Sequence, residues 1–214
     1  MTEETRGLTA FDGDTVALET VSRILRTEGC KDFVETGTFE GGTSLGIARA
    51  FSDVTVWTTE KDPTLFKKAL QRFCKARLDG VVVRNLFGYS AALLEQKILP
   101  DLRPRPFFWL DAHISIWNVQ HGSAFPEHYP LRDEIKAIAA FKHLRPIIAI
   151  HDFYSPTRPE FSFDQDHGVR LDWAYIEDVI TLVYPSPVPH FHNTEATGNK
   201  VGIVYIGLDS SLAL

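Results

Sequence analysis

Cysteine is scarce in this chain of 214 residues, which contains only Cys30 and Cys74. Two cysteines are too few for a disulfide framework, so we interpret both as free thiols in a reducing compartment. Long apolar runs are also missing, because FFWL at 107–110 and PIIAI at 146–150 fall short of the ~20 residues that span a bilayer. The polar start, MTEETRGLTAFDGDT, offers no signal peptide. We therefore expect a soluble, cytoplasmic protein that does not attach to membranes.

An excess of positive charge is absent as well. The chain has 22 Lys and Arg against 28 Asp and Glu, a formal net charge of −6, which argues against a nucleic-acid partner. The hydrophobic and charged fractions, 44% and 23%, are typical of globular domains. Repeats, low-complexity tracts and a dividing linker are also missing. We expect a single domain over residues 1–214, with residues 1–13 as a flexible N-terminus.

What the sequence does contain is an alternation of strand and helix patterns. Apolar stripes and capping residues predict helices at 14–28, 43–51, 63–78, 89–98, 131–144 and 172–184. Apolar and β-branched runs predict strands at 32–36, 54–59, 81–85, 107–113, 146–153 and 200–208. This order favours βαβ units, and so an α/β fold in which a mostly parallel sheet is covered on both faces, a three-layer αβα sandwich. Such sheets bind ligands beyond the carboxyl ends of their strands.

The first strand runs into a glycine-rich turn, FVETGTFEGGTS at 33–44. Its glycines, Gly37, Gly41 and Gly42, permit tight turns and a close approach of a ligand to the backbone. The helix that follows offers free N–H groups to a polar or anionic ligand. The spacing matches neither the dinucleotide-binding G-x-G-x-x-G pattern nor a phosphate-binding P-loop. The turn is therefore either a ligand site of another kind or a plain strand-to-helix connection.

The end of the second strand favours the ligand interpretation. Glu60 lies roughly 20 residues beyond the glycines, where a carboxylate accepts hydrogen bonds from ribose hydroxyls. Asp62 has a competing role as the N-cap of the helix that begins with Pro63. Glu60 could also be a solvated loop carboxylate, but its combination with the glycine turn is more specific than either feature alone.

Five segments together resemble the ordered motifs of class I S-adenosylmethionine-dependent methyltransferases. They read FVETGTFEGGTS, TTEKDP, GYSAALL, FFWLDAH and IIAIHDF, and they run from about residue 30 to about residue 155. The nearer likeness is to a branch of small methyltransferase-like proteins related to macrolide-sugar O-methyltransferases and cephalosporin-hydroxylase-like proteins. The resemblance implies a Rossmann-like sheet of seven strands in the order 3-2-1-4-5-7-6, with an antiparallel last strand at 200–208.

The resemblance also implies roles for single residues. Glu35 and the turn at 37–41 would hold the amino-acid part of S-adenosylmethionine, and Glu60 would bind its ribose. Tyr89 and Ser90 would lie beside the adenine, and Asp111 would face the methyl group. The full set of implied cofactor-binding residues is Glu35, Thr36, Gly37, Thr38, Gly41, Thr43, Ser44, Glu60, Lys61, Tyr89, Ser90 and Asp111.

Two polar clusters follow the fourth and fifth strands. Asp111 and His113 alternate on one side of WLDAH, and His151 and Asp152 end IAIHDF. Asp111, His151 and Asp152 could hold a divalent cation, either magnesium or a transition metal, which would activate an acceptor hydroxyl. Asp111, His113 or His151 could instead act in catalysis directly, a histidine as general base. The sugar O-methyltransferases carry Asp-Asp where this chain has His151-Asp152, so an empty metal site and buried structural histidines stay open.

The leading hypothesis is methylation of a hydroxyl on a small molecule such as a sugar or natural product. A metal-dependent hydroxylase or hydrolase that uses the same cluster, and a cofactor-binding protein without turnover, are the alternatives. Long loops at 114–130 and 154–172 would shape the acceptor pocket. Their aromatic residues either stack on the acceptor or pack the loops onto the sheet; these are Trp117, Phe125, Tyr129 and Tyr154. The N-terminal helix could cap the pocket or form a homodimer.

Overall fold

A seven-stranded sheet forms the centre of the molecule, which a computed structural model describes over residues 9–112 and 129–208. The strands lie in the order β3-β2-β1-β4-β5-β9-β8. The first five are parallel, and β9 is antiparallel to both of its neighbours. Counted along the chain within this sheet, the order is the predicted 3-2-1-4-5-7-6, so the predicted fold class is confirmed. The strands are β1 (Asp32–Thr36), β2 (Thr55–Glu60), β3 (Val83–Phe87), β4 (Phe107–Leu110), β5 (Ile147–Ile150), β8 (His190–His192) and β9 (Val204–Ile206).

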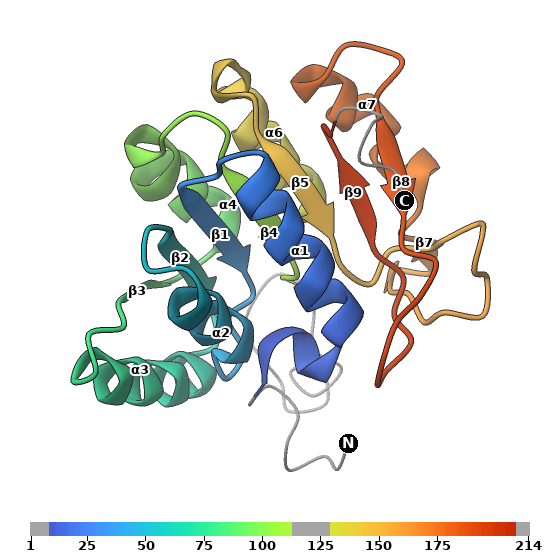
Figure 1. Cartoon of the computed structure of the whole chain (residues 1–214). Helices are drawn as coiled ribbons and strands as arrows, with labels where there is room; N and C mark the ends of the chain where they lie inside the picture. Colours follow the sequence, from blue (N-terminus) through green and yellow to red (C-terminus); the bar gives the residue numbers. More distant parts are fainter. Residues whose placement is uncertain (1–8, 113–128, 209–214) are drawn as a thin grey trace.

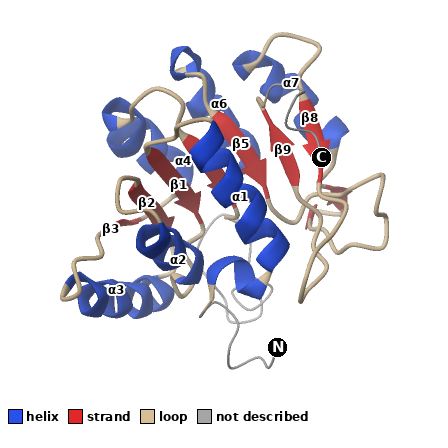
Figure 2. Cartoon of the chain, in the orientation of Figure 1, coloured by secondary structure: helices blue, strands red, loops and turns tan. Residues whose placement is uncertain are grey.

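Helices cover both faces of this sheet (Figures 1 and 2). One face carries α1 (Thr15–Thr27), α2 (Gly42–Ala50) and α3 (Pro63–Arg77), and the other carries α4 (Ser90–Leu93), α6 (Leu131–Ala139) and α7 (Trp173–Val183). Successive strand residues enter opposite cores: Phe33 packs on the α1 side, and Val34 packs on the α6 side. Because β4 and β5 are buried on both faces, they read as continuous apolar runs, as parallel strands do.

Capping side chains fix the starts of two helices where the sequence predicts them. The Asp14 carboxylate accepts the N–H groups of Val16 and Ala17, which begins α1. Asp62 does the same at α3, where Pro63 occupies the first turn.

Several boundaries differ from the predicted ones because short irregular turns replace helix or strand. The predicted helix at 89–98 is α4 followed by the π-helical turn η3 (Leu94–Ile98) and the 3-10 turn η4 (Leu99–Asp101). The predicted helix at 131–144 ends at Ala139, and a separate 3-10 turn, η5 (Lys142–Leu144), leads to Arg145 with a left-handed φ of 56°. Within the predicted loop at 154–172, β6 (Gln165–Asp166) and β7 (Val169–Arg170) form a small ribbon.

Residues 10–13, predicted within a flexible N-terminus, instead form the 3-10 turn η2 (Ala10–Gly13). The reason is packing: the Phe11 ring is 5% exposed and lies edge-on to Trp109, with ring centroids 4.6 Å apart. Its backbone N–H also donates to Thr43 Oγ1 at 3.0 Å. This segment therefore reaches the start of α2 and the end of β4. Among the described residues, no helix is long and apolar enough to cross a bilayer.

Candidate functional site

Glu35, at the end of β1, is the buried centre of the glycine-rich turn. Its Oε2 atom accepts hydrogen bonds from the Ser44 hydroxyl at 2.5 Å and from the Thr58 hydroxyl at 3.0 Å. Burial raises the pKa of Glu35 to about 8, although the Ser44 hydroxyl opposes the shift. The carboxyl group therefore ties β1, β2 and the first turn of α2 together at the place where the sequence predicts a cofactor.

The glycines of this turn are required by contacts within the chain. Gly37 has a φ of 81°, and a Cβ atom there would lie 2.5 Å from the carbonyl oxygen of Asp111. Gly41 precedes α2 with a φ of 82°, and its Cβ would meet the Phe73 ring at 2.6 Å. The tight approach of Gly37 to Asp111 brings the β1 turn against the end of β4. The β1 turn and Asp111, which is predicted to face the methyl group, are therefore in direct contact.

The remaining predicted residues of the turn have partners inside the protein. The Thr38 and Thr58 hydroxyls are 2.6 Å apart, and the N–H groups of residues 37 and 38 both donate to the Thr59 carbonyl. The Thr43 hydroxyl accepts the N–H of Phe11. These threonine side chains therefore hold the shape of the turn.

Glu60 ends β2 and lies beside the same turn. One carboxylate oxygen accepts the N–H of Phe39 and the other accepts the N–H of Asp62, each at 2.9 Å. Glu60 is 7% exposed, and burial raises its pKa. Each carboxylate oxygen has two lone pairs, so these bonds leave acceptor capacity for ligand hydroxyls. Lys61, which follows, is partly buried.

The two residues predicted beside the adenine follow β3. Tyr89 is 41% exposed and precedes α4, whereas Ser90 begins α4 and is 7% exposed. Both belong to the carboxyl-end edge of the sheet, next to β2, as the topology requires. At this edge Glu60 ends β2 and Lys61 follows it, and Ser90 lies beyond the end of the neighbouring strand β3.

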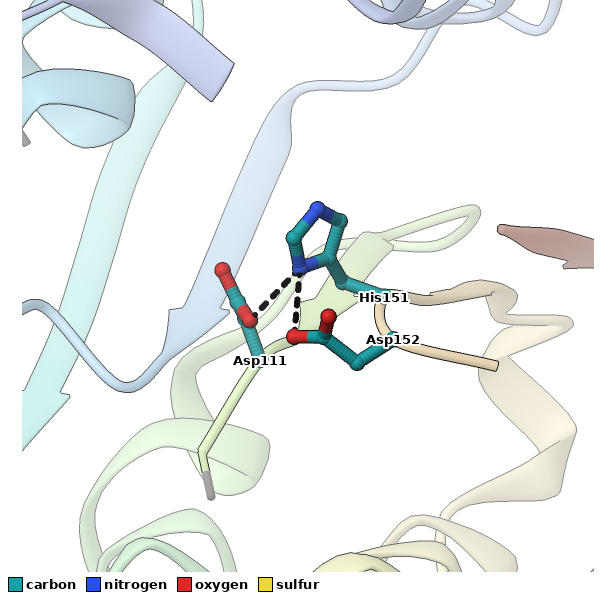
Figure 3. Close-up of side chains that lie close together, drawn as sticks. All are labelled: Asp111, His151 and Asp152. Carbon is teal, nitrogen blue, oxygen red and sulfur yellow. Dashed lines mark hydrogen bonds and ion pairs between the residues drawn. The ribbon is translucent and has the colours of Figure 1, made fainter. Parts of the chain in front are cut away.

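Asp111, His151 and Asp152 converge at the ends of β4 and β5 (Figure 3). The Nδ1 atom of His151 lies 2.9 Å from Asp111 Oδ1 and 3.0 Å from Asp152 Oδ2. The Trp109 indole N–H donates to the other oxygen of Asp111 at 3.3 Å. All three candidate ligand atoms lie within 4.8 Å of one another. The structure therefore brings together the three residues that the sequence predicts as metal ligands.

The charges within this trio attract one another. Burial alone would lower the pKa of His151, but the carboxylates of Asp111 and Asp152 outweigh it and raise the pKa well above its usual value. The two carboxylates thus favour the protonated form of His151. The same negative environment suits a divalent cation.

The spacing of the trio also fits such an ion. Neighbouring ligand atoms of an octahedral ion, at ~2.1 Å from the metal, lie about 3.0 Å apart. The separations of 2.9 and 3.0 Å from Nδ1 to the two carboxylates are compatible with this edge length. A set of one imidazole and two carboxylates suits manganese, iron or zinc better than magnesium.

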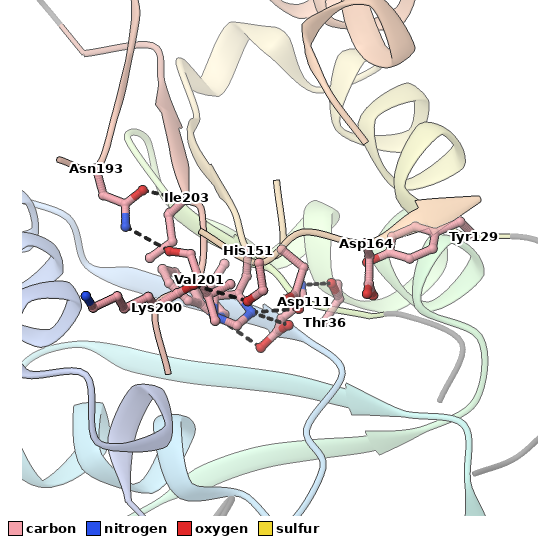
Figure 4. A network of polar contacts seen from close by, with 12 residues as sticks. Thr36, Asp111, Tyr129, His151, Asp164, Asn193, Lys200, Val201 and Ile203 are labelled. Atoms are coloured by element: carbon pink, nitrogen blue, oxygen red, sulfur yellow. Dashed lines mark hydrogen bonds and ion pairs between the residues drawn. The ribbon is translucent and has the colours of Figure 1, made fainter. Parts of the chain in front are cut away.

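A cavity of about 310 Å³ opens beside His151 and Asp152. It lies between the N-terminal turn, the segment after β5 and the connection from β8 to β9. Its walls are mostly polar, and they include Asp14, Glu160, Thr197 and Lys200. The connection from β8 to β9 is held by the Asn193 amide, which donates to the Val201 carbonyl at 2.9 Å and accepts the N–H of Ile203 at 2.8 Å (Figure 4).

Known proteins resemble this chain in structure alone. No family model matches the sequence, and no curated protein matches it. An O-methyltransferase from Bacillus cereus, solved in complex with SAH, superposes with a TM-score of 0.60 at 17% identity, over 96% of this chain and 86% of that chain. The O-methyltransferase TomG from Streptomyces achromogenes, involved in tomaymycin synthesis and solved with SAM, gives 0.58 at 15% identity over 94% and 82%. The chain has the Rossmann-like methyltransferase fold.

A third example of the methyltransferase fold is the SAH-bound methyltransferase PaMTH1 from Podospora anserina. It matches with a TM-score of 0.55 at 14% identity, over 98% of this chain and 80% of that chain. The likeness therefore extends over nearly the whole chain, including the segments at both ends of the sheet. At these identities it establishes the fold, and the chemistry must be argued from the residues.

Some predicted residues of the site fall elsewhere. His113, Trp117 and Phe125 lie outside the described residues. Tyr129 is 7% exposed and its hydroxyl donates to Asp164 at 3.4 Å, while Tyr154 packs edge-on against the Phe163 ring, with centroids 5.1 Å apart. For these two aromatic residues, packing of the loops is the observed role.

One acidic residue of the site escapes the sequence analysis. Glu134 of α6 is fully buried, and its neighbours include Thr36 and Ser90. Its position within LRDEIKAIAA gives the only sequence signal, because Leu131, Ile135 and Ile138 place the apolar stripe of the helix next to it. A carboxylate at the border of such a stripe is normally solvated, so the sequence does not single it out.

Proposed function

We propose that this protein is an S-adenosylmethionine-dependent O-methyltransferase that acts on a small hydroxylated molecule, such as a sugar or natural product. The observation that carries the proposal is the convergence of three features at one edge of the methyltransferase fold. They are the buried Glu60 carboxylate, the Gly37 turn in contact with Asp111, and the Asp111–His151–Asp152 trio. The branch of small methyltransferase-like proteins named above is part of the same proposal.

The residues present fit the cofactor. Glu60 retains lone pairs for the two ribose hydroxyls, and the Gly37 turn beside it would lie against the amino-acid part. Asp111 lies against that turn, so a methyl group carried by the amino-acid part would face the trio. The cofactor supplies an electrophilic methyl group on a sulfonium, and the protein must align the acceptor hydroxyl with it.

The trio fits a divalent cation as a second group. Asp111, His151 and Asp152 would hold it, and the bound ion would lower the pKa of an acceptor hydroxyl. The protein's own contribution is to orient that hydroxyl, and the cavity beside His151 and Asp152 is the place for the acceptor. We propose no role for nucleic acid or membranes, a cytoplasmic location, and a homodimer as the possible assembly.

Isothermal titration calorimetry with SAH tests the cofactor, and mass spectrometry after incubation with SAM, Mn²⁺ and a panel of hydroxylated compounds tests the reaction. We expect SAH to bind with micromolar affinity, and NADH and ATP to bind far more weakly. A gain of one methyl group on a panel member supports an enzyme. Absence of SAH binding at millimolar concentration would contradict the proposal, whereas binding without transfer to any compound would favour a cofactor-binding protein without turnover.

A further inference from the structure

Asp14 is a buried carboxylate that uses only one of its two oxygens. It is 7% exposed, and its Oδ1 atom accepts four hydrogen bonds of 2.9–3.2 Å. The donors are the N–H groups of Val16 and Ala17 and both the N–H and the hydroxyl of Thr197. Within the described residues, Oδ2 accepts no hydrogen bond, and no basic side chain forms an ion pair with Asp14. A buried charge without a partner is costly, so Oδ2 calls for a donor from outside the chain.

Two distant segments hold the Asp14 carboxylate in place. Asp14 is the N-cap of α1, whereas Thr197 belongs to the connection from β8 to β9. The Thr197 hydroxyl also accepts the N–H of Thr15 at 2.7 Å, so the two segments are joined by several bonds. The amino end of a helix carries roughly half a positive charge, which offsets only part of the charge on a carboxylate. A negative charge in a fixed position therefore remains at Oδ2.

Asp14 lines the cavity of about 310 Å³ beside His151 and Asp152. The described residues of its wall include four carboxylates but only one lysine or arginine, Lys200. Lys200 acts electrostatically on Glu160, and His151 contacts Asp152. Neither of these basic groups is paired with Asp14. The wall therefore favours a ligand that brings its own positive charge.

We infer that the acceptor carries an ammonium group, which binds Asp14 Oδ2 while its hydroxyl lies at the end of the cavity formed by His151 and Asp152. The inference rests on the proposed function, which places the acceptor in this cavity. An ammonium offers three donors and forms charge-assisted hydrogen bonds with a carboxylate, whereas a neutral hydroxyl in its place forms weaker ones. The volume suits a small molecule, so the substrate class is a hydroxylated amine of the size of an amino sugar.

Matched pairs of compounds that differ in a single amine test the inference. They are glucosamine with glucose, galactosamine with galactose, and tyramine with 4-ethylphenol, at a pH where each amine is protonated. Ligand-observed NMR titration with saturating SAH gives the affinity of each compound. We expect the wild type to bind the amine of at least one pair about fivefold or more tightly than its neutral partner.

The charge of Asp14 can be removed without removing the helix cap. Asn and Ser are as good N-caps as Asp, so Asp14→Asn and Asp14→Ser should both fold, which circular dichroism melting checks. In both variants the ratio between amine and neutral partner should fall to about one. Asp172→Asn, the same change at the N-cap of α7, is the matched control and should keep the wild-type ratio, because Asp172 does not line the cavity. A general loss of structure would weaken both members of a pair alike.

The outcomes separate this inference from the proposed function. If SAH itself does not bind to the wild type, the proposed function fails, and the assignment of the acceptor fails with it. If SAH binds but no amine is preferred over its neutral partner, the proposed function stands and the inference is overturned. A preference that persists in Asp14→Asn and Asp14→Ser would also overturn it, because Asp14 would then not be the group that selects the ammonium.

Discussion

The Ser44 hydroxyl donates a 2.5 Å hydrogen bond to the Glu35 carboxylate, which joins the first turn of α2 to the end of β1. Thr58 of β2 adds a second donor to the same oxygen. The sequence predicts that Glu35 and Ser44 contact a cofactor. In the structure they contact each other, and they hold the β1 turn and the start of α2 in place. Because Glu35 is buried, ionisation of its carboxyl group lowers the stability of the folded protein, and this effect depends on pH.

Replacing Glu35 with Gln should flatten the pH dependence of stability. The folded pKa of about 8 lies above the ordinary value of 4.5, so folding favours the neutral carboxyl group. Its contribution is fully present below about pH 4.5 and is lost as the pH rises towards 8, with a slope of at most ~1.4 kcal/mol per pH unit. Urea unfolding at pH 5, 6.5 and 8.5 measures it. We expect Glu35→Gln to gain stability relative to wild type as the pH rises, whereas the exposed change Glu19→Gln on α1 should follow the wild type. A constant difference across this range would argue against the raised pKa.

Gly37 and Gly80 provide a matched pair for the close approach of the β1 turn to β4. Both have left-handed φ angles, 81° and 82°, but a Cβ at Gly37 would lie 2.5 Å from the Asp111 carbonyl, whereas nothing lies within 4 Å at Gly80. Gly80→Ala should cost only the backbone strain, about 1–2 kcal/mol. Gly37→Ala should cost clearly more in denaturant titrations and should weaken SAH binding by at least tenfold. Equal losses of stability in the two variants would show that the turn can shift away from Asp111.

Much of the fold is readable from the sequence because parallel strands and capped helices have strong local signals. The strand at 32–36 is short and runs into glycines, and Asp62 with Pro63 marks a helix start; both boundaries match the structure. The ribbon of β6 and β7 is not predicted, because each strand has two residues and no alternation to detect. Phe11 is missed as a core residue because its partner, Trp109, is distant in sequence.

The site is readable only in part, for a related reason. Strand ends in a parallel sheet meet at one edge, so Asp111, His151 and Asp152 could be brought together from sequence and topology. The orientation of the side chains could not be predicted in the same way. Thr43 pairs with Phe11 and Ser44 with Glu35, contacts that depend on tertiary packing. Glu134 reaches the site from a helix, and no spacing rule links it to the strand ends.

Glu60 should be the largest single side-chain contributor to cofactor affinity. Glu60→Ala removes both oxygens that would accept the ribose hydroxyls, so we expect SAH affinity to fall at least severalfold. The change also leaves the N–H groups of Phe39 and Asp62 without their partner, so Glu60→Gln, which keeps one acceptor oxygen, serves as the milder variant. Calorimetry should rank the affinities wild type, Gln, Ala in falling order. The exposed change Glu95→Ala should leave the affinity unaltered. Unchanged affinity in Glu60→Ala would remove Glu60 from the cofactor site.

The trio at the ends of β4 and β5 should bind Mn²⁺, and Asp152 is the best residue for testing this. Asp152→Asn keeps the size of the side chain but removes one of the two charges that face His151 Nδ1. We expect Mn²⁺ to raise the melting temperature of the wild type, because a ligand that binds only the folded state stabilises it by mass action. That shift should shrink in Asp152→Asn, and calorimetry should show at least tenfold weaker Mn²⁺ binding.

Asp79→Asn, an exposed change after α3, should retain both effects. EDTA should abolish the shift in the wild type. If Asp152→Asn and wild type bind Mn²⁺ equally, the ion binds elsewhere, and the trio is not a metal site.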